Sequence, residues 1–574
     1  MLSSFASSLL PASSIQSGAA IWHVSNPIPI RGEFPLKSEC LPFSQIPHTT
    51  RLFTDFLSYS PAVRQFYPRS PHFSEWLAHE QPNVRYESQR RQQVASILER
   101  QNRNWNASPK TLENIDRLKR GACVAVTGQQ VGLFGGPLFS LFKALSAVKL
   151  SNEATAARID CVPVFWLATE DHDLAEVNNT TLVNAEGGLQ KLVTPSHGVP
   201  DASVGTIQFG AEIEPIVSTA ADLLGTSGVV EALRSAYRPG ETLGSAFARL
   251  FATLFADWGV ILLDSSDPEL HAVGEPIYRG AIELAKQLDD ALLTRGKELE
   301  SAGYHQQVKV TPSSTLLFTF RDGARVPIHR RINGSNEVEF LISEEKISQP
   351  ALLAKIAQAP QNFSANVLLR PVLQDFLLPT LVYTGGSAEV AYFAQAAVVY
   401  EALLSHVTPV LPRFSATLVE SKPQRLLDRY GIKLPDLVQG PEKLRERLGE
   451  RALPADLQAA FDEANSQLES SLSKIRAALA RLDPTLVDAA GRATSKIQYQ
   501  LEHLRASAAR AELRQSELLA RHAEVLSNTL YPDKALQERE IAGVYFLARQ
   551  GSDLLQQLYG AIHTDCLDHQ VIYL

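Results

Sequence analysis

The stretch from residue 121 to residue 150 constrains the fold most, because a short apolar run, a glycine cluster and a helical pattern follow one another within it. Residues 122–126 are small or β-branched and predict a buried strand. Glycines then cluster between residues 128 and 136, and apolar residues recur at helical spacing from Leu138 to Val148. This order predicts an α/β fold, in which the N–H groups of the loop can approach an anionic ligand at the positive end of the helix.

The glycine loop matches neither common nucleotide-binding signature. It contains no Walker A sequence and no GxGxxG, since nothing like GK[ST] follows it. A tight βα turn without a ligand is therefore an equally good interpretation of this stretch alone. The neighbouring amides of Gln129 and Gln130 favour a ligand slightly, because they offer both donors and acceptors.

Length and composition set wider bounds. A chain of 574 residues is long enough for several domains. A net charge of −8 argues against a general nucleic-acid-binding or membrane-surface role. Four widely spaced cysteines without a CxxC pair predict neither a disulfide framework nor a structural zinc site, and they favour a reducing cytoplasm. No apolar segment reaches the ~18–20 residues that span a bilayer.

A polar cluster follows the next apolar run, at residues 161–168, which is typical of a strand buried in a parallel sheet. The cluster consists of Glu170, Asp171, His172 and Asp173, and the carboxyl ends of such strands are where open α/β sheets bind ligands. His172 with a carboxylate could act as acid and base, or the cluster could hold a metal. Successive residues of an extended segment face opposite ways, so we expect no metal here.

Further segments extend the α/β pattern. Residues 259–264 predict another buried strand, and residues 268–299 predict the helices that follow it. Residues 315–331 predict an antiparallel hairpin that gathers basic side chains, which suit carboxylates and phosphates. An exposed hairpin without a ligand is an equal alternative. The basic residues of this hairpin are Arg321, Arg325, His329, Arg330 and Arg331.

A second glycine turn, at Gly385 and Gly386, follows a predicted strand that contains Tyr383. The helix after it is expected to begin near Ser387, which could cap it, and this helix carries Glu389. Beyond residue 441, apolar residues repeat at spacings of three and four, with one interruption at residues 483–484. This pattern predicts two long antiparallel helices, and it is compatible both with packing inside one chain and with dimerisation.

Together these motifs resemble a known family, the cysteine-adding enzymes of bacillithiol synthesis. The matching stretches are CLPFSQIPHTTRLFTDFL from Cys40, VTGQQVGLFGGPLFSLFKA, PVFWLATEDHDLAEVN, LRPVLQDFLLPTLVYTGGSAEVAYFAQ and the ending DHQVIYL. The resemblance implies an α/β fold whose Rossmann-type parallel sheet core is related to class I aminoacyl-tRNA synthetases, with connecting insertions and an α-helical coiled-coil domain that mediates dimerisation. It also implies the last step of bacillithiol formation, in which the carboxyl group of cysteine is joined to the amino group of glucosaminyl malate.

The sequence departs from the synthetase pattern at two places. The Gln129-Gln130 loop replaces the His-Ile-Gly-His signature, and Lys422 is only a faint echo of the second, lysine-containing signature. A free carboxylate is nevertheless a poor acylating agent, so amide formation needs activation by adenylation or phosphorylation. We therefore expect ATP as co-substrate, with no metal beyond the magnesium that accompanies a nucleotide.

These considerations assign roles to particular residues. His172, with Asp171 or Asp173, is expected to receive the proton of the attacking amine. Contacts with substrate or nucleotide are expected from Gly128, Gln129, Gln130, Gly135, Gly136, Lys143, Glu170, Arg321, His329, Arg331, Tyr383, Gly385, Gly386 and Glu389.

The expected domain organisation has four parts. Residues 1–38, rich in Ser, Ala and Pro, predict a disordered extension rather than a secretory signal. Residues 39–425 predict the core, with insertions at about 200–250 and 300–350, residues 426–530 the coiled-coil domain, and residues 531–574 a segment that docks on the core. We expect a homodimer and small-molecule substrates, with no nucleic-acid or membrane partner. The alternatives are a nucleotide-binding scaffold that acts through its coiled coil and a metal-dependent hydrolase that uses the Glu170 to Asp173 cluster.

Overall fold

The structure is a computed structural model that describes residues 36–77, 86–195, 200–332, 338–564 and 566–574. The extension predicted for residues 1–38 lies outside the described residues up to residue 35. The structure places Lys37 and Ser38, which the prediction assigned to the extension, in strand β1 (Lys37–Leu41). Among the described residues, no helix combines the length and the apolar character needed to cross a membrane.

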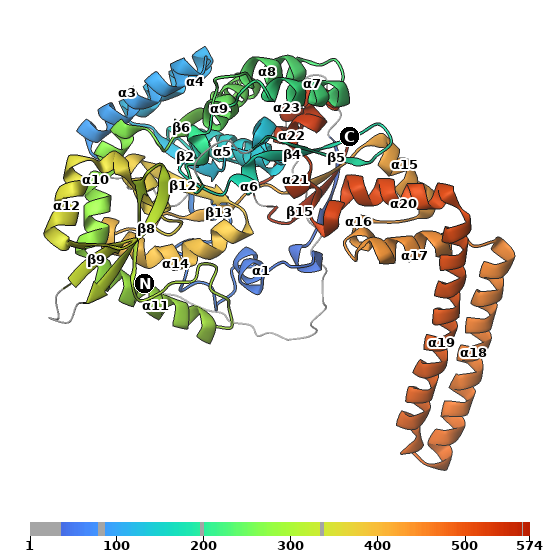
Figure 1. Ribbon diagram of the computed structural model, residues 1–574. Coiled ribbons are helices and arrows are strands. Elements are labelled where there is room, and N and C mark those ends of the chain that lie inside the picture. The colour runs from blue at the N-terminus through green and yellow to red at the C-terminus, as the bar shows by residue number, and fades with distance from the viewer. Residues whose placement is uncertain (1–35, 78–85, 196–199, 333–337, 565) are drawn as a thin grey trace, which may run out of the picture. The chain divides into compact units, whose positions relative to one another are not determined.

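The core is a parallel five-stranded sheet in the order β13-β12-β2-β3-β6 (Figure 1). The chain runs outward from the central strand β2 through β3 to β6, and then returns to the other side of β2 with β12 and β13. This order has its topological switch point between β2 and β12, as in doubly wound nucleotide-binding folds. The predicted Rossmann-type core is confirmed. Its strands are β2 (Cys123–Gln129), β3 (Cys161–Leu167), β6 (Ile261–Asp264), β12 (Thr380–Gly385) and β13 (Val410–Pro412).

Helices cover both faces of this sheet, which explains the continuous apolar runs of its strands. Along β3, Val164 and Trp166 point into one hydrophobic core, whereas Phe165 and Leu167 point into the other. The first core is completed by α3 (Ser88–Asn104), α4 (Pro109–Arg120), α10 (Pro268–Glu283), α11 (Ala285–Ser301), α13 (Arg370–Leu377) and α14 (Ser387–Leu404). The second contains α5 (Phe139–Ala156), α7 (Ile213–Leu224), α8 (Gly228–Ala236) and α9 (Leu243–Leu254).

Two groups of strands lie outside the core sheet. A hairpin of β4 (Asn179–Val183) and β5 (Leu189–Val193) follows β3 after the short helix α6 (Leu174–Val177). An antiparallel sheet in the order β10-β9-β8-β7-β11 contains the predicted basic hairpin. Its strands are β7 (Ser314–Arg321), β8 (Ala324–Ile332), β9 (Val338–Ile342), β10 (Glu345–Ser348) and β11 (Phe363–Ala365).

The second glycine turn differs from the prediction in one detail. Helix α14 begins at Ser387, but the capping position is Gly386 rather than Ser387. The N–H of Gly386 donates to Oε2 of Glu389 at 2.7 Å, so a carboxylate in the first turn satisfies this amide in place of a serine hydroxyl.

The predicted helical hairpin is confirmed as α18 (Ala455–Leu482) and α19 (Leu486–Gln515), which lie side by side (Figure 1). The reversal between them is held by Asp483, whose Oδ1 accepts from the N–H and the hydroxyl of Thr485 at 2.9 and 2.8 Å. The helices around its base pack against one another, and they are α15 (Ser421–Tyr430), α16 (Leu434–Leu437), α17 (Pro441–Arg451) and α20 (Glu517–Leu530).

The C-terminal strand pairs with the first strand of the described chain and with a strand from its middle. Strand β15 (His569–Tyr573) lies between β1 and β14 (Ala416–Val419), antiparallel to the first and parallel to the second. Three helices precede it, α21 (Gln537–Glu540), α22 (Gly543–Gln550) and α23 (Asp553–Ala561). Glu538 of α21 forms a buried ion pair with Arg413, with Oε1 2.6 Å from Nη2.

His569 makes this region sensitive to acid. Its ring is buried, with Nδ1 2.7 Å from the Ser415 hydroxyl and Nε2 2.9 Å from the Thr417 hydroxyl. Burial lowers the pKa of His569 from 6.5 to about 4, with nearby Arg413 lowering it and Glu538 opposing. The folded state therefore favours the neutral ring. The contribution of His569 to the free energy of unfolding is complete above the unfolded pKa of histidine and is lost as the pH falls toward 4.

The free energy of unfolding is expected to fall by about 3 kcal/mol as the pH decreases from the unfolded pKa of His569 toward 4. Replacing His569 by Gln, which does not titrate, should remove this part of the pH dependence. Urea unfolding of both proteins at about pH 7 and about pH 4.5 measures the difference. Equal acid sensitivity of the two proteins would contradict the assignment.

Candidate active site

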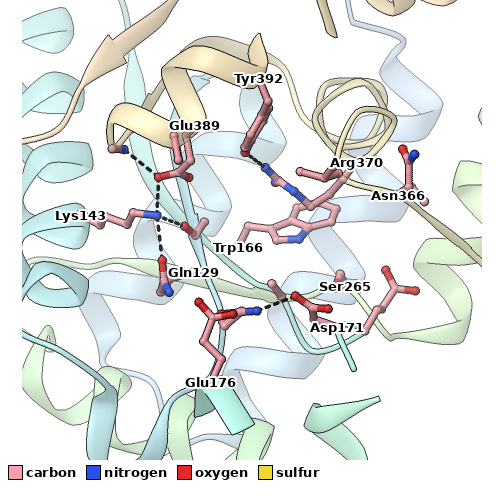
Figure 2. Close-up of a pocket in the computed structure, with 18 of the residues that line it drawn as sticks. Gln129, Lys143, Trp166, Asp171, Glu176, Ser265, Asn366, Arg370, Glu389 and Tyr392 are labelled. Atoms are coloured by element: carbon pink, nitrogen blue, oxygen red, sulfur yellow. Dashed lines mark hydrogen bonds and ion pairs between the residues drawn. The ribbon is translucent and has the colours of Figure 1, made fainter. Parts of the chain in front are cut away.

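A cavity of about 590 Å³ lies at the carboxyl ends of the central strands, at the switch point between β2 and β12 (Figure 2). Gly128 and Gln129 line it from the end of β2, Ala168 from the end of β3, and Gly386 and Glu389 from the start of α14. Open α/β sheets bind ligands at such a crevice. The strand order and the cavity therefore point to the same place.

Lys143 of α5 links the end of β2 to the start of α14, the helix that follows β12. Its Nζ atom lies 2.6 Å from Oε2 of Glu389, 2.6 Å from the carbonyl oxygen of Gly128 and 2.9 Å from Oε1 of Gln129. Burial lowers the pKa of Lys143 to about 8, although Glu389 acts to raise it. At neutral pH the ammonium group is still mostly charged, and it holds the end of β2 against the start of α14.

Glu389 completes this centre from the other side. Its Oε1 accepts a hydrogen bond from the hydroxyl of Tyr383, and its Oε2 accepts from the N–H of Gly386. Burial acts to raise the pKa of Glu389, but Lys143 and these donors outweigh it, so the pKa is lowered. The buried pair is thus ionised on both sides at neutral pH.

The lining as a whole carries charged side chains of both signs. It contains five basic side chains, Lys143, Arg325, Arg370, Arg413 and Arg539, and four carboxylates, Glu170, Asp171, Glu176 and Glu389. Within the described part of the chain, two buried donors of the lining have no hydrogen-bond partner, Nε1 of Trp166 and Nε of Arg413. The five cations are balanced by these four carboxylates and by Glu538, which pairs with Arg413. The unsatisfied N–H donors nevertheless suit an anionic ligand such as a phosphate or a carboxylate.

The arginines differ in how firmly they are held. Arg370 donates through Nη2 to the Tyr392 hydroxyl at 2.6 Å. Burial acts to lower the pKa of Arg370, but Tyr392, Tyr383 and Glu389 outweigh it, so the pKa is raised. Arg325 donates through Nε to Ser364 at 2.9 Å and through Nη2 to the carbonyl oxygen of Ala365 at 2.7 Å. Both guanidinium groups are therefore oriented before any ligand binds.

The Glu170 to Asp173 cluster occupies a turn after β3. Oε1 of Glu170 lies 3.2 Å from Nε2 of the buried His271, and Oδ2 of Asp171 accepts from Nε2 of Gln130 at 2.6 Å. His172 lies beside this lining, with Nδ1 3.5 Å from both Oδ1 of Asp171 and Nη1 of Arg325. Asp173 stands at the start of α6. Searched over the described residues, the structure holds no group of three or more His, Cys, Asp or Glu side chains that could bind a metal ion.

The structure brings about half of the predicted site residues into the lining. These are Gly128, Gln129, Gln130, Lys143, Glu170, Asp171, Gly386 and Glu389. The other predicted residues lie outside the lining. Tyr383, Gly385 and His172 are next to lining residues. Asp173, the later glycines of the first loop and three side chains of the basic hairpin also lie outside it.

Gly135 and Gly136 shape the loop but do not line the cavity. Their φ values are +86° and +71°, and a Cβ on Gly132 would lie 2.9 Å from the Cα of Gly136. The start of the following helix is covered by the C-terminal segment, because the N–H of Leu138 donates to the carbonyl oxygen of Ile541 at 2.9 Å. The structure therefore places this part of the loop outside the cavity, and its expected contact with a ligand stays a prediction.

Arg321, His329 and Arg331 lie outside the lining, to which the hairpin contributes Phe318 and Arg325. Arg321 pairs with Glu345, and Arg331 stands opposite Glu339 in the sheet. Since a strand rises roughly 3.3 Å per residue, His329 and Arg331 lie roughly 13 and 20 Å along β8 from Arg325. A cluster of basic residues in the sequence of a strand is thus spread over its length.

Sequence reasoning missed several lining residues, among them Trp166, Arg370 and Arg539. Each comes from a different segment, and nothing in its immediate sequence separates it from a surface or core residue. Trp166 and Arg370 each lie inside a stretch that carried the family resemblance, which was the only available signal.

The doubly wound sheet, the arginine-lined cavity at its switch point and the helical hairpin define a Rossmann-like protein with a coiled-coil extension. The family model described as "Bacillithiol biosynthesis BshC, N-terminal Rossmann-like domain" matches residues 36–414, and the one described as "Bacillithiol biosynthesis BshC, C-terminal coiled-coil domain" matches residues 416–574. The chain therefore belongs to the bacillithiol biosynthesis BshC family, and it is an enzyme of the ligase class.

Two relatives illustrate the similarity, and both are named "Putative cysteine ligase BshC". The protein of Koribacter versatilis is 47% identical over 534 residues, which cover 93% of this chain and 99% of the relative. The protein of Solibacter usitatus is 35% identical over 536 residues, with the same coverage. Among solved structures, Mycobacterium tuberculosis methionyl-tRNA synthetase in complex with methionyl-adenylate matches 76% of this chain and 91% of its own, with 10% identity and a TM-score of 0.23.

Proposed function

We propose that this chain joins the carboxyl group of L-cysteine to the amino group of glucosaminyl malate at the expense of ATP, as the last step of bacillithiol biosynthesis. The names of the relatives support cysteine as a substrate. The observation that carries the proposal is the arginine-lined cavity built around the Lys143–Glu389 pair at the switch point of the sheet. We place the reaction in the cytoplasm, because the cysteine spacing favours a reducing compartment.

The cavity fits the requirements of carboxylate activation. A phosphate chain and a free carboxylate both need N–H donors in fixed positions, and Arg325, Arg370 and Arg413 line the cavity with such groups. The unpartnered N–H groups of Trp166 and Arg413 are further donors in the same lining. When bound, ATP supplies the phosphorus centre that converts the cysteine carboxylate into an acylating agent.

Amide formation also needs an unprotonated amine held beside the activated carbonyl carbon. Asp171 and Glu170 can bind the sugar amine as it enters, and His172 can take its proton. Nδ1 of His172 lies 3.5 Å from both the Asp171 carboxylate and the Arg325 guanidinium, and the proposed role requires the tautomer whose Nδ1–H is directed at Asp171, which leaves Nε2 as the proton acceptor. The amine nitrogen then forms the new bond to the carbonyl carbon, while the phosphate-containing group leaves with the electron pair.

His172 provides a direct test of this role. Replacing it by Ala should lower kcat by about 10²-fold, the lower end of the usual range for a general base, because His172 lies beside the lining. His329→Ala is the matched control, since His329 stands on β8 outside the cavity. Single-turnover amide formation measures the effect, and equal rates in the two variants would remove His172 from the mechanism.

Oxygen-18 in the cysteine carboxyl group tests the activation step itself. Adenylation transfers one labelled oxygen to AMP, and phosphorylation transfers it to inorganic phosphate. We expect label in one of these two products. Amide formation with no label in either product would show that ATP does not activate the carboxylate.

We further propose that the hairpin of α18 and α19 forms the dimer interface. Apolar side chains on it remain exposed, among them Ile475 at 52% and Leu504 at 59%. A second copy of the hairpin would cover them.

We expect a dimer by light scattering and a monomer after joint replacement of Ile475 and Leu504 by Glu. The control is Val193→Glu, an equally exposed position on β5, outside the helical hairpin of α18 and α19. A monomeric native chain would overturn this assignment.

A further inference from the structure

The fold arranges the four cysteines in two pairs that the sequence does not suggest. Cys123 and Cys161 stand opposite each other on the adjacent strands β2 and β3. Cys40 and Cys566 are 526 positions apart in the chain, yet their Sγ atoms are 3.1 Å apart. Cys40 and Cys566 are both free thiols. The wide spacing that argued against a disulfide framework therefore does not keep these two thiols apart.

The pairing of β1 with β15 explains this proximity. Cys40 lies on β1 opposite Gln570, and Cys566 lies in the short segment that leads into β15. This segment is tied to the start of the chain, because Oδ1 of Asp568 accepts from the N–H of Phe43 at 3.4 Å. Its other end is fixed by the N–H of Cys566, which donates to the carbonyl oxygen of His563 at 3.0 Å. The two sulfur atoms are thus held together by backbone structure on both sides.

The two thiols differ in accessibility. Cys40 is exposed, whereas Cys566 is partly buried. Burial, followed by the Cys40 thiol, raises the pKa of Cys566 to about 12. At neutral pH, Cys40 is therefore the thiol that meets a reagent first. Once Cys40 has reacted, its thiol no longer raises the pKa of Cys566, and Cys566 becomes the better placed second nucleophile.

We propose that Cys40 and Cys566 form a reversible oxidation site that exchanges with low-molecular-weight disulfides. The Cys40 thiolate attacks one sulfur of the reagent RSSR, forms a mixed disulfide and releases one RS⁻. The Cys566 thiolate then attacks Sγ of Cys40, which closes the protein disulfide and releases the second RS⁻. The two protein thiols lose their protons to solvent, and one RSSR is reduced to two thiols. This inference is independent of the proposed function.

The position of the pair gives the oxidation two consequences. The new bond closes the chain between residues 40 and 566 into one loop, which restricts the unfolded state and raises resistance to unfolding. Cys566 also lines a small cavity together with Ser415 and Arg413, and Arg413 lines the main cavity as well. The oxidised pair therefore fixes the segment beside an arginine of the candidate active site.

Exchange of the full-length protein with glutathione disulfide tests the proposal. Peptide mapping without reduction should find a Cys40–Cys566 cross-link, with Cys123 and Cys161 still free, and dithiothreitol should reverse it. The melting temperature of the oxidised protein should exceed that of the reduced protein.

Three variants separate the two steps. Cys566→Ser should accumulate a mixed disulfide with glutathione at Cys40, because the second nucleophile is missing. Cys40→Ser should leave Cys566 unmodified, and Cys123→Ser should form the same cross-link as the native chain. A lasting mixed disulfide at Cys40 in the native chain, a disulfide between two chains, or no reaction at Cys40 would each overturn the proposal.

Discussion

Replacing Lys143 by Met is expected to lower kcat/KM for amide formation by about 10³-fold or more, the largest effect among the changes considered. Lys143 contacts Glu389, Gly128 and Gln129 at once, so its loss frees the end of β2 from the start of α14. It also removes a positive charge from the lining. Positioning and electrostatic stabilisation are both lost with one side chain.

The control for this prediction is Lys149→Met on the same helix. Lys149 lies outside the cavity and stacks over the ring of Tyr559, so its loss should leave turnover within a factor of about two. Glu389→Gln should reproduce most of the Lys143 defect, since it leaves the ammonium group without its counter-ion. Full activity of Lys143→Met with unchanged ATP binding would remove this pair from the account.

Replacing Glu538 by Ala is expected to destabilise the C-terminal segment by about 3–5 kcal/mol. Glu538 is buried, and its carboxylate accepts from Arg413, from the Ser415 hydroxyl and from the N–H of Ala416. The substitution leaves the Arg413 guanidinium buried without its counter-ion. The lowered pKa of Glu538, to which Arg413 contributes against the effect of burial, agrees with a stabilising pair.

Hydrogen exchange of the β15 amides measures this loss directly, because it reports on the segment rather than on the whole chain. Glu540→Ala is the matched control on the same short helix, and it should change protection by no more than about 0.5 kcal/mol. Unchanged protection of β15 in Glu538→Ala would show that other contacts hold the segment in place.

The parts of the fold that the sequence predicted depend on local patterns. The strand, glycine loop and helix around Gly128 follow from periodicity and glycine content, and the hairpin follows from apolar spacing interrupted at Pro484. The position of β15 between β1 and β14 could not be predicted in this way, because it joins segments from both ends and the middle of the chain.

The same distinction applies to the candidate site. Asp171 was singled out because it follows a buried strand, whereas Gln129 and Glu389 were singled out beside glycine turns, and the structure places all three in the lining. The partnership of Lys143 with Glu389 could not be predicted, since it requires knowing that β12 returns beside β2. The basic hairpin misled for a related reason, because residues close in sequence are spread along an extended strand.

The most direct test of the central claim is product formation by mass spectrometry, with purified protein, cysteine, glucosaminyl malate and ATP, each omitted in turn. The proposed function predicts bacillithiol only in the complete mixture. No product in that mixture, with ATP still bound, would contradict it and would favour a nucleotide-binding scaffold that acts through its coiled coil.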